Sequence, residues 1–311
     1  MDTANNNDIN DSDTETDTKV IVNPYNFNNK LINENFITSI FNTYGMDYVP
    51  NDMSLYQHAF IHKSYCVKKL VTLGENTVLV DKPEGALPLM EYDNERLEFL
   101  GDSILSPIVA NYLYERYPDQ DEGFMTKMRT KLVCGETLAK FSRELGFGEY
   151  IVVSRHIEDK CNGRNSTSIL EDAFEAFIGA LFQDFNNASS DSNIGKRHKN
   201  CYSDFCTGVG FQVAQELFIN IIEEHIDFSE LVLRDFNYKD QLLKYFQRTF
   251  HIPVKYTEIE CEGMPNERVY TMGVLDAEEK IVTMGSGKSK KKAEQEASRN
   301  ALIYYDVITS L

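Results

Sequence analysis

Apolar side chains recur at helical spacing over most of the first 227 residues. They fall three or four positions apart in five stretches, which is the period of a helix with one buried face. The stretches are 34–45, 94–117, 124–145, 169–185 and 210–226. Two segments interrupt the pattern: 67–92 mixes short β-like runs with Pro and Gly, and 186–204 is polar and rich in Asn, Ser and Gly. Both are expected to be surface insertions.

The pattern changes after Phe236. A helical stretch at 238–250 is followed by three short runs typical of strands, at 254–263, 267–276 and 280–287, and by a last helical stretch at 290–305. The sequence therefore predicts a multidomain chain. We expect an all-α domain over 32–228, with insertions near 67–92 and 186–204, followed by an α+β domain of α-β-β-β-α order over 236–308.

Charge is unevenly distributed along the 311 residues, which carry a net charge of -18. Acids and bases balance in the C-terminal segment, so the excess of acids lies in the rest of the chain. The first 18 residues hold acids, no base and almost no bulky apolar side chain, which predicts a disordered acidic tail over residues 1–31. This balance argues against nonspecific coating of nucleic acid. Any nucleic-acid site would have to be local.

Targeting signals and cysteines restrict the compartment. The N-terminus has neither the basic region nor the apolar stretch of a signal peptide, and no apolar run approaches the length that spans a bilayer. Six cysteines at irregular spacings are typical of reduced thiols rather than of a disulfide framework. We therefore expect an intracellular protein, cytoplasmic or nuclear, that is neither secreted nor in a membrane.

Acidic side chains share one face on each of two predicted helices. Glu95, Glu98 and Asp102 lie at i, i+3 and i+7, and Asp172 and Glu175 repeat the i, i+3 spacing. If the two faces meet, the repulsion between like charges calls for a cation, and oxygen ligands favour a hard ion such as Mg²⁺. The plainer interpretation is a solvated helix face, which is what acids three residues apart usually mean.

A longer motif surrounds these acids. The run 94–103, NERLEFLGDS, resembles the signature of the ribonuclease III family, endonucleases that cleave double-stranded RNA. Three further segments are similar to parts of the same family: HAFIHKSY at 58–65, Asp121-Glu122-Gly123, and LEDAFEA at 170–176. The resemblance covers about residues 32–228, apart from the two insertions.

The resemblance implies roles for individual residues. Glu98 and Glu175 would be direct metal ligands, with Asp102 and Asp172 beside them and all four needed for hydrolysis. Mg²⁺ would be the cofactor, with Mn²⁺ as a substitute. Glu95 and Glu122 match acids that support dimer stability and RNA engagement, and Phe99 matches the aromatic residue that packs into a partner subunit. The family forms homodimers with one active site for each RNA strand.

The C-terminal segment resembles a double-stranded-RNA-binding domain. Its main evidence is the run 285–293, GSGKSKKKA, where Lys288, Lys290, Lys291 and Lys292 are expected to reach phosphates from the start of the last helix. Two regions depart from the family pattern. Leu243 and Lys244 replace the usual Gln-Glu of the first helix, and Asn266 stands where a His is usual. Both departures predict weaker minor-groove contacts.

Other candidate sites are less supported. His58 and His62 are spaced i, i+4 without the Glu of a metalloprotease motif, so packing or hydrogen bonding is favoured. His198, Cys201 and Cys206 are irregularly spaced for zinc. The sequence has no GxxxxGK[ST] loop, so a nucleotide cofactor is not indicated. We favour a Mg²⁺-dependent endoribonuclease that yields 5′-phosphate and 3′-hydroxyl ends. The alternatives are a noncatalytic protein that sequesters duplex RNA and a structural dimer partner for another nuclease or ribonucleoprotein.

Overall fold

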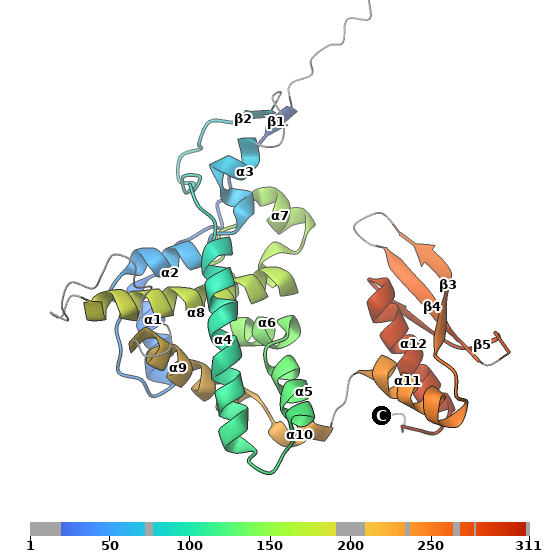
Figure 1. Cartoon of the computed structure of the whole chain (residues 1–311). Coiled ribbons are helices and arrows are strands. Elements are labelled where there is room, and N and C mark those ends of the chain that lie inside the picture. Colours follow the sequence, from blue (N-terminus) through green and yellow to red (C-terminus); the bar gives the residue numbers. More distant parts are fainter. Residues whose placement is uncertain are drawn as a thin grey trace, which may run out of the picture. The chain divides into compact units, whose positions relative to one another are not determined.

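The computed structural model divides the chain into two compact units, Met1–Asp227 and Phe228–Leu311 (Figure 1). It describes residues 20–71, 77–190, 209–233, 237–263, 268–276 and 278–308. Each unit has its own hydrophobic core. None of the helices within these ranges is long and apolar enough to cross a bilayer.

The first unit is helical, as the apolar spacing predicts. Its longest helices are α4 (Glu95–Arg116) and α8 (Thr167–Ser190), which cross each other (Figure 1). The other α-helices are α1 (Glu34–Thr43), α2 (Met53–Ala59), α3 (Val67–Val71), α5 (Glu122–Leu132), α6 (Gly135–Glu144), α7 (Arg155–Lys160) and α9 (Val209–His225). Three 3-10 helices, η1 (Lys63–Tyr65), η2 (Phe147–Glu149) and η3 (Gly163–Asn165), and two short strands, β1 (Val20–Val22) and β2 (Thr77–Leu79), complete it.

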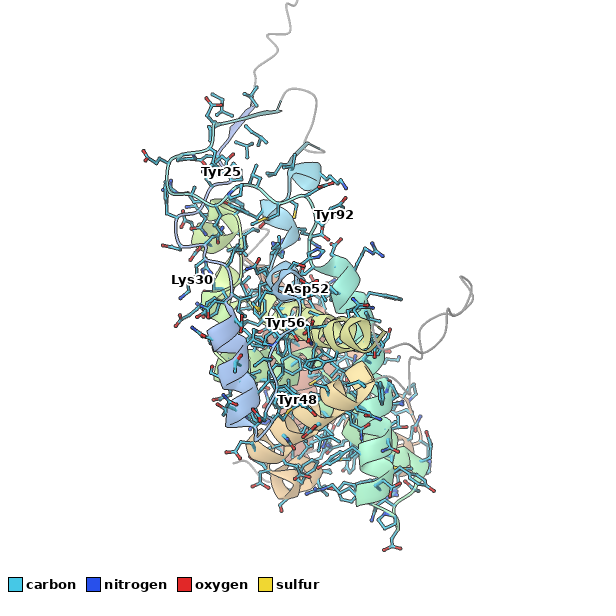
Figure 2. The ribbon with its side chains drawn as sticks, turned by 90° about the vertical axis from the view of Figure 1, so that its left-hand side faces the viewer. Tyr25, Lys30, Tyr48, Asp52, Tyr56 and Tyr92 are labelled. Carbon is cyan, nitrogen blue, oxygen red and sulfur yellow. The ribbon has the colours of Figure 1, made fainter. Side chains whose placement is uncertain are left out.

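Helix α8 forms the centre of this unit. Every residue from 173 to 182 is buried, because α2, α4, α6 and α9 all pack around the helix. Further along α8, the buried carboxylate of Asp184 accepts hydrogen bonds from the backbone N–H groups of Asn51 and Asp52 and from the Tyr56 hydroxyl. In Figure 2, Tyr56 lies in the interior of the unit, and Asp52 precedes α2 as its N-cap. These bonds fix α2 against α8.

The N-terminal residues 20–33, here called the arm, pack against the first unit. Strand β1 pairs in parallel with β2 of the 67–92 insertion. Tyr25 is buried in a cluster with Tyr65, and the side-chain amides of Asn26 and Asn29 donate to the carbonyl of Val153. The disordered tail predicted for residues 1–31 therefore does not extend over 20–31, since buried amide groups hold that part of the arm. Residues 1–19 lie outside the described ranges.

The insertion is closed at its base by backbone hydrogen bonds. The N–H of Val67 donates to the carbonyl of Met90, and the N–H of Met90 donates to the carbonyl of Tyr65, at 3.0 and 3.1 Å. Inside, Ala86 and the partly buried Leu87 join the Tyr25 cluster. The second predicted insertion begins inside α8, which continues to Ser190, and most of it lies outside the described ranges.

The second unit begins with α10 (Phe228–Leu233) and has the predicted α-β-β-β-α order. After α11 (Tyr238–Thr249), strands β3 (Lys255–Glu262), β4 (Val269–Leu275) and β5 (Ile281–Gly287) form an antiparallel sheet, followed by α12 (Lys290–Tyr304). Leu242 and Phe246 of α11 meet Val274 of the sheet and Ala297 and Leu302 of α12 in the core.

Candidate functional site

Helices α4 and α8 touch backbone to backbone at two glycines. A Cβ built on Gly101 would lie 1.7 Å from the carbonyl oxygen of Glu175, and one built on Gly179 would lie 2.3 Å from the carbonyl oxygen of Leu97. Both distances are far below any real contact, so the crossing requires glycine on each helix. The close approach brings the acidic face of α4 directly against that of α8.

The predicted acids on the two helices meet at this crossing. Glu95, Glu98 and Asp102 follow one face of α4, while Leu97 and Ile104 on the other side are buried in the core. On α8, Asp172 and Glu175 lie next to Phe174 and Phe177, which are fully buried. The helical spacing thus places the acids at the border between the core and the solvent.

The acids are close enough to raise one another's pKa values. Burial raises the pKa of Glu175 to about 8, with further contributions from the charges of Asp102, Glu171 and Glu98. Burial and Glu171 raise the pKa of Asp172 to about 6, against an opposing effect of Lys63. The pKa of Glu98 is also raised, by burial and then by Asp172. The pKa values of Glu98, Asp172 and Glu175 are therefore raised both by burial and by acids of the same cluster.

Two residues that the structure places at this site are not among those predicted from the sequence. Glu171 precedes Asp172, and its pKa is raised by burial and by Glu98. A Cβ on Gly135 would lie 2.3 Å from Glu171 Oε2, so the Glu171 carboxylate occupies space against the first residue of α6. Lys63 is the second: its Nζ lies 3.0 Å from Glu95 Oε1. Glu171 could have been found because it stands four residues before Glu175, on the same side of α8.

The chemistry of these side chains suits a hard divalent cation. All donors are carboxylate oxygens, the ligands that Mg²⁺ prefers. Within the described ranges, no group of three His, Cys, Asp or Glu side chains is arranged around a common point for an ion. Carboxylates this close repel one another when they are ionised. A cation would remove that repulsion, so the residues present fit a metal ion.

Two other predicted residues lie apart from this cluster. Glu122 is exposed in the first turn of α5, where the Thr126 hydroxyl donates to it at 2.9 Å. At 1.5 Å per residue, the end of α4 at Arg116 is already about 20 Å along the helix axis from Asp102. Glu122 is thus not part of the acid cluster of its own chain. Phe99 projects from α4 with 76% of its surface exposed.

The histidines of the HAFIHKSY segment have structural contacts. His58 Nε2 lies 2.6 Å from the carbonyl oxygen of Asp93, next to the start of α4. His62 Nδ1 accepts from the backbone N–H of Ser64 and caps η1. Both therefore make hydrogen bonds, as the sequence favours. His198, Cys201 and Cys206 lie outside the described ranges.

In the second unit, the predicted lysines gather at the start of α12. Gly285 lets β5 approach this helix, since a Cβ there would lie 2.1 Å from the backbone nitrogen of Ala297. Ser289 caps α12 by accepting from the N–H of Lys292. Lys288 and Lys291 are exposed, whereas Lys290 forms an ion pair of 2.5 Å with Glu258 of β3. The motif thus presents cations beside the end of the sheet.

The first-helix departures are on α11. Leu243 is partly buried there, and Lys244 forms an ion pair of 2.6 Å with Asp240, one turn earlier. Asn266 lies outside the described ranges.

Comparison with known proteins agrees with this arrangement of two units. Residues 52–197 match a family described as Ribonuclease-III-like, and residues 238–305 match the double-stranded RNA binding motif. A probable ribonuclease 3 of Acanthamoeba polyphaga mimivirus is 28% identical over 288 residues, which are 92% of this chain but 48% of that protein. Ribonuclease 3 of Lactococcus lactis subsp. lactis is 33% identical over 261 residues, 84% of this chain and 93% of that protein. The chain belongs to the ribonuclease III family.

The chain combines the ribonuclease III endoribonuclease domain with a C-terminal double-stranded-RNA-binding domain, as the sequence predicts. It spans about half the length of the mimivirus relative. Among solved structures, the nuclease domain of ribonuclease III from Campylobacter jejuni is 28% identical, with a TM-score of 0.41, covering 61% of this chain and 98% of that one.

Proposed function

We propose that this endoribonuclease hydrolyses double-stranded RNA in a Mg²⁺-dependent reaction, leaves 5′-phosphate and 3′-hydroxyl ends, and acts as a homodimer in RNA processing or degradation. One observation carries the proposal: Glu175 is 9% exposed and has a pKa of about 8 beside Asp102, at the contact between Gly101 and the Glu175 backbone. Ionising a carboxyl group at that position is costly unless a cation compensates its charge.

Four acids of this chain would hold the metal: Glu98, Asp102, Asp172 and Glu175. When bound, Mg²⁺, or Mn²⁺ as a substitute, polarises a phosphoryl oxygen and lowers the pKa of a bound water for in-line attack. Burial and the neighbouring acids favour the protonated form of Glu175, and a bound cation would favour loss of that proton. Glu95 keeps Lys63 at the edge of the site, where its ammonium group can pair with a phosphate of the substrate.

A homodimer supplies one site for each strand. Phe99 offers an exposed aromatic side chain on α4, the helix that carries two of these four acids. Exposed aromatic residues of this size are typical anchors of protein interfaces. Twofold symmetry would then place a second copy of the acid cluster opposite the first. Glu95 and Glu122 are proposed to support this dimer and its engagement with RNA.

The second unit would hold the duplex. Lys288, Lys290, Lys291 and Lys292 are proposed to contact phosphates across a groove, with a small favourable contribution from the α12 dipole. The free thiols of Cys66, Cys134, Cys161 and Cys261 suit a reducing compartment, which supports a cytoplasmic or nuclear location.

The decisive experiment compares the wild type with Glu175→Gln on labelled duplex RNA, in Mg²⁺ and in chelator. Cleavage by the wild type should require the metal. The cleavage rate of the variant should be lower by about a thousandfold or more, while its affinity for the duplex stays similar. Glu115→Gln, an exposed acid at the other end of α4, is the matched control and should cleave normally. Cleavage by Glu175→Gln at the wild-type rate would refute the site. Binding without any cleavage by the wild type would favour an RNA-sequestering protein.

A further inference from the structure

An exposed aromatic residue and a lysine stand together next to the acidic helix. Tyr92 is 55% exposed, and the Lys68 ammonium lies 4.3 Å from the centre of its ring. Tyr92 comes three residues before Glu95, the first residue of α4, and Lys68 belongs to α3 of the insertion. Figure 2 shows Tyr92 near the surface at the end of the unit that contains the insertion. A partly exposed tyrosine offers a partner both an apolar ring and a polar hydroxyl group.

The backbone on both sides of this pair is held in place. The N–H of Asn94 donates to the carbonyl of Ile61 at 2.9 Å, and His58 Nε2 bonds the carbonyl of Asp93. On the other side, the N–H of Val67 donates to the carbonyl of Met90. The Tyr92 and Lys68 side chains therefore project from a scaffold that is fixed to the first turn of α4. A contact made through them would be pre-organised relative to the acids.

Cations continue from the acid cluster to this pair. Lys63 bonds Glu95 at the edge of the cluster and also interacts with Asp172 and Glu98. Lys68 follows five residues later. A phosphate backbone that approaches six acids in a chain of net charge -18 meets repulsion, which local cations at the border of the site must offset. Lys63 occupies that border, and Lys68 follows it in α3 of the insertion.

We propose that Lys68 and Tyr92 contact the ribose-phosphate backbone of duplex RNA beside the bond that is cut. The proposal rests on the proposed function and deepens it, because it assigns the 67–92 insertion to substrate binding. Lys68 supplies an ammonium group for a phosphate, and the face of Tyr92 packs against a ribose. Glu91 opposes this contact, since it precedes Tyr92 in the chain and its carboxylate carries the same charge as the phosphate.

The same chemistry occurs elsewhere in the unit and provides a control. The Lys30 ammonium lies 4.6 Å from the centre of the Tyr150 ring, and Lys30 pairs with Glu149 at 2.8 Å. This second pair also combines a lysine, a tyrosine and a neighbouring glutamate. Lys30 belongs to the arm, and in Figure 2 it lies on the opposite side of the unit from Tyr92. A loss of charge at Lys30 should leave RNA binding unchanged.

The test uses the full-length chain in two assays. The first measures binding of labelled duplex RNA over a range of salt concentrations, with Glu175→Gln present in every protein so that cleavage does not interfere. The second measures single-turnover cleavage in Mg²⁺ with Glu175 intact. The variants are Lys68→Ala combined with Tyr92→Leu, Glu91→Gln alone, and Lys30→Ala as the control.

Lys68→Ala with Tyr92→Leu should weaken binding about tenfold and lower the salt slope by about one counterion, because one phosphate contact is lost. In the cleavage assay, the half-saturating concentration should rise while the maximal rate changes by less than about twofold. Glu91→Gln should tighten binding, a change of opposite sign that a folding defect could not produce. Unchanged binding by the double variant, or an equal loss in Lys30→Ala, would overturn the proposal. Failure of the wild type to cleave duplex RNA would instead refute the proposed function, and the binding assay would still report on Lys68 and Tyr92.

Discussion

The α-carbon of Gly101 faces the backbone carbonyl of Glu175 so closely that no side chain fits between them. Gly101→Ala should therefore push α4 away from α8 and lower the free energy of unfolding by about 3 kcal/mol, with loss of cleavage. Urea denaturation of both proteins measures the change. Gly123→Ala is the control, because Gly123 lies in the exposed first turn of α5 and a Cβ there would be 3.4 Å from the nearest atom, Asp121 Oδ1. Equal stability of Gly101→Ala and the wild type would contradict the close crossing.

Removing the metal should make the stability of the nuclease domain depend on Glu175. Its pKa is about 8 in the folded chain against 4.5 ordinarily. As pH rises from 4.5 to 8, the unfolded state loses this proton before the folded state does, so folding becomes less favourable. In chelator at pH 8, Glu175→Gln should be more stable than the wild type by roughly 2–4 kcal/mol. Thermal unfolding at pH 5 and pH 8 tests this, and saturating Mg²⁺ should stabilise only the wild type.

Low pH should destabilise the segment that carries Lys63, because His62 in that segment would become protonated. Burial lowers the pKa of His62 from 6.5 to about 4, and its Nδ1 must stay unprotonated to accept from the Ser64 N–H. Below pH 6.5, His62 binds a proton in the unfolded state but not in the folded state. The free energy of unfolding therefore decreases as pH falls. His62→Asn keeps an acceptor but does not titrate. Between pH 7 and pH 5.5 the wild type should lose about 1 kcal/mol more than this variant. Parallel losses would show that His62 does not cause the acid sensitivity.

Releasing Lys290 should strengthen RNA binding. Lys290 is held by Glu258 and lies over the Tyr270 ring, 5.9 Å from its centre. Glu258→Gln frees the ammonium group for a phosphate, so affinity should rise about threefold and the salt dependence should steepen. Glu278→Gln removes the same charge from the Lys280 ion pair and controls for the general change in charge. An equal gain in both variants would mean that the Glu258 pair itself has no special effect.

Phe99 should control the oligomeric state. Phe99→Ala should raise the dimer dissociation constant by roughly tenfold or more, because the side chain would be a central anchor. Sedimentation velocity over a concentration series measures this. Phe27→Ala removes a similarly exposed aromatic, 64% exposed, from the arm and should leave the dimer intact. A Phe99→Ala protein that remains dimeric at every concentration would refute the assignment.

Local periodicity explains what could be predicted. Glu95, Glu98 and Asp102 are related by helix geometry alone, so their common face follows from the sequence. The motifs also predict both domains and the order of elements in the second one. The close approach of α4 and α8 at Gly101 could not be predicted in this way, because it depends on which surface of α8 the glycine contacts.

Contacts between distant residues could not be predicted in the same way. Lys63 reaches Glu95 across 32 residues, and Asn26 reaches Val153 across 127. The composition of residues 1–18 favours disorder, and the prediction extends that disorder into the arm. Its amide groups instead hydrogen-bond the backbone of a distant segment, and composition carries no information about such a partner.

The closed base of the 67–92 insertion makes it a place where the enzyme can change in size. The N–H of Val67 donates to the carbonyl of Met90, and the N–H of Met90 donates to the carbonyl of Tyr65. These two hydrogen bonds hold the ends of the intervening loop together, whatever its length. Doubling the length of a loop with fixed ends costs only about 0.6 kcal/mol. Residues can therefore be added to or removed from the outer part of the insertion while Glu95 and the acids behind it keep their positions. Under the role proposed for Lys68 and Tyr92, changes in this loop would alter how the enzyme holds its substrate and leave the catalytic acids in place.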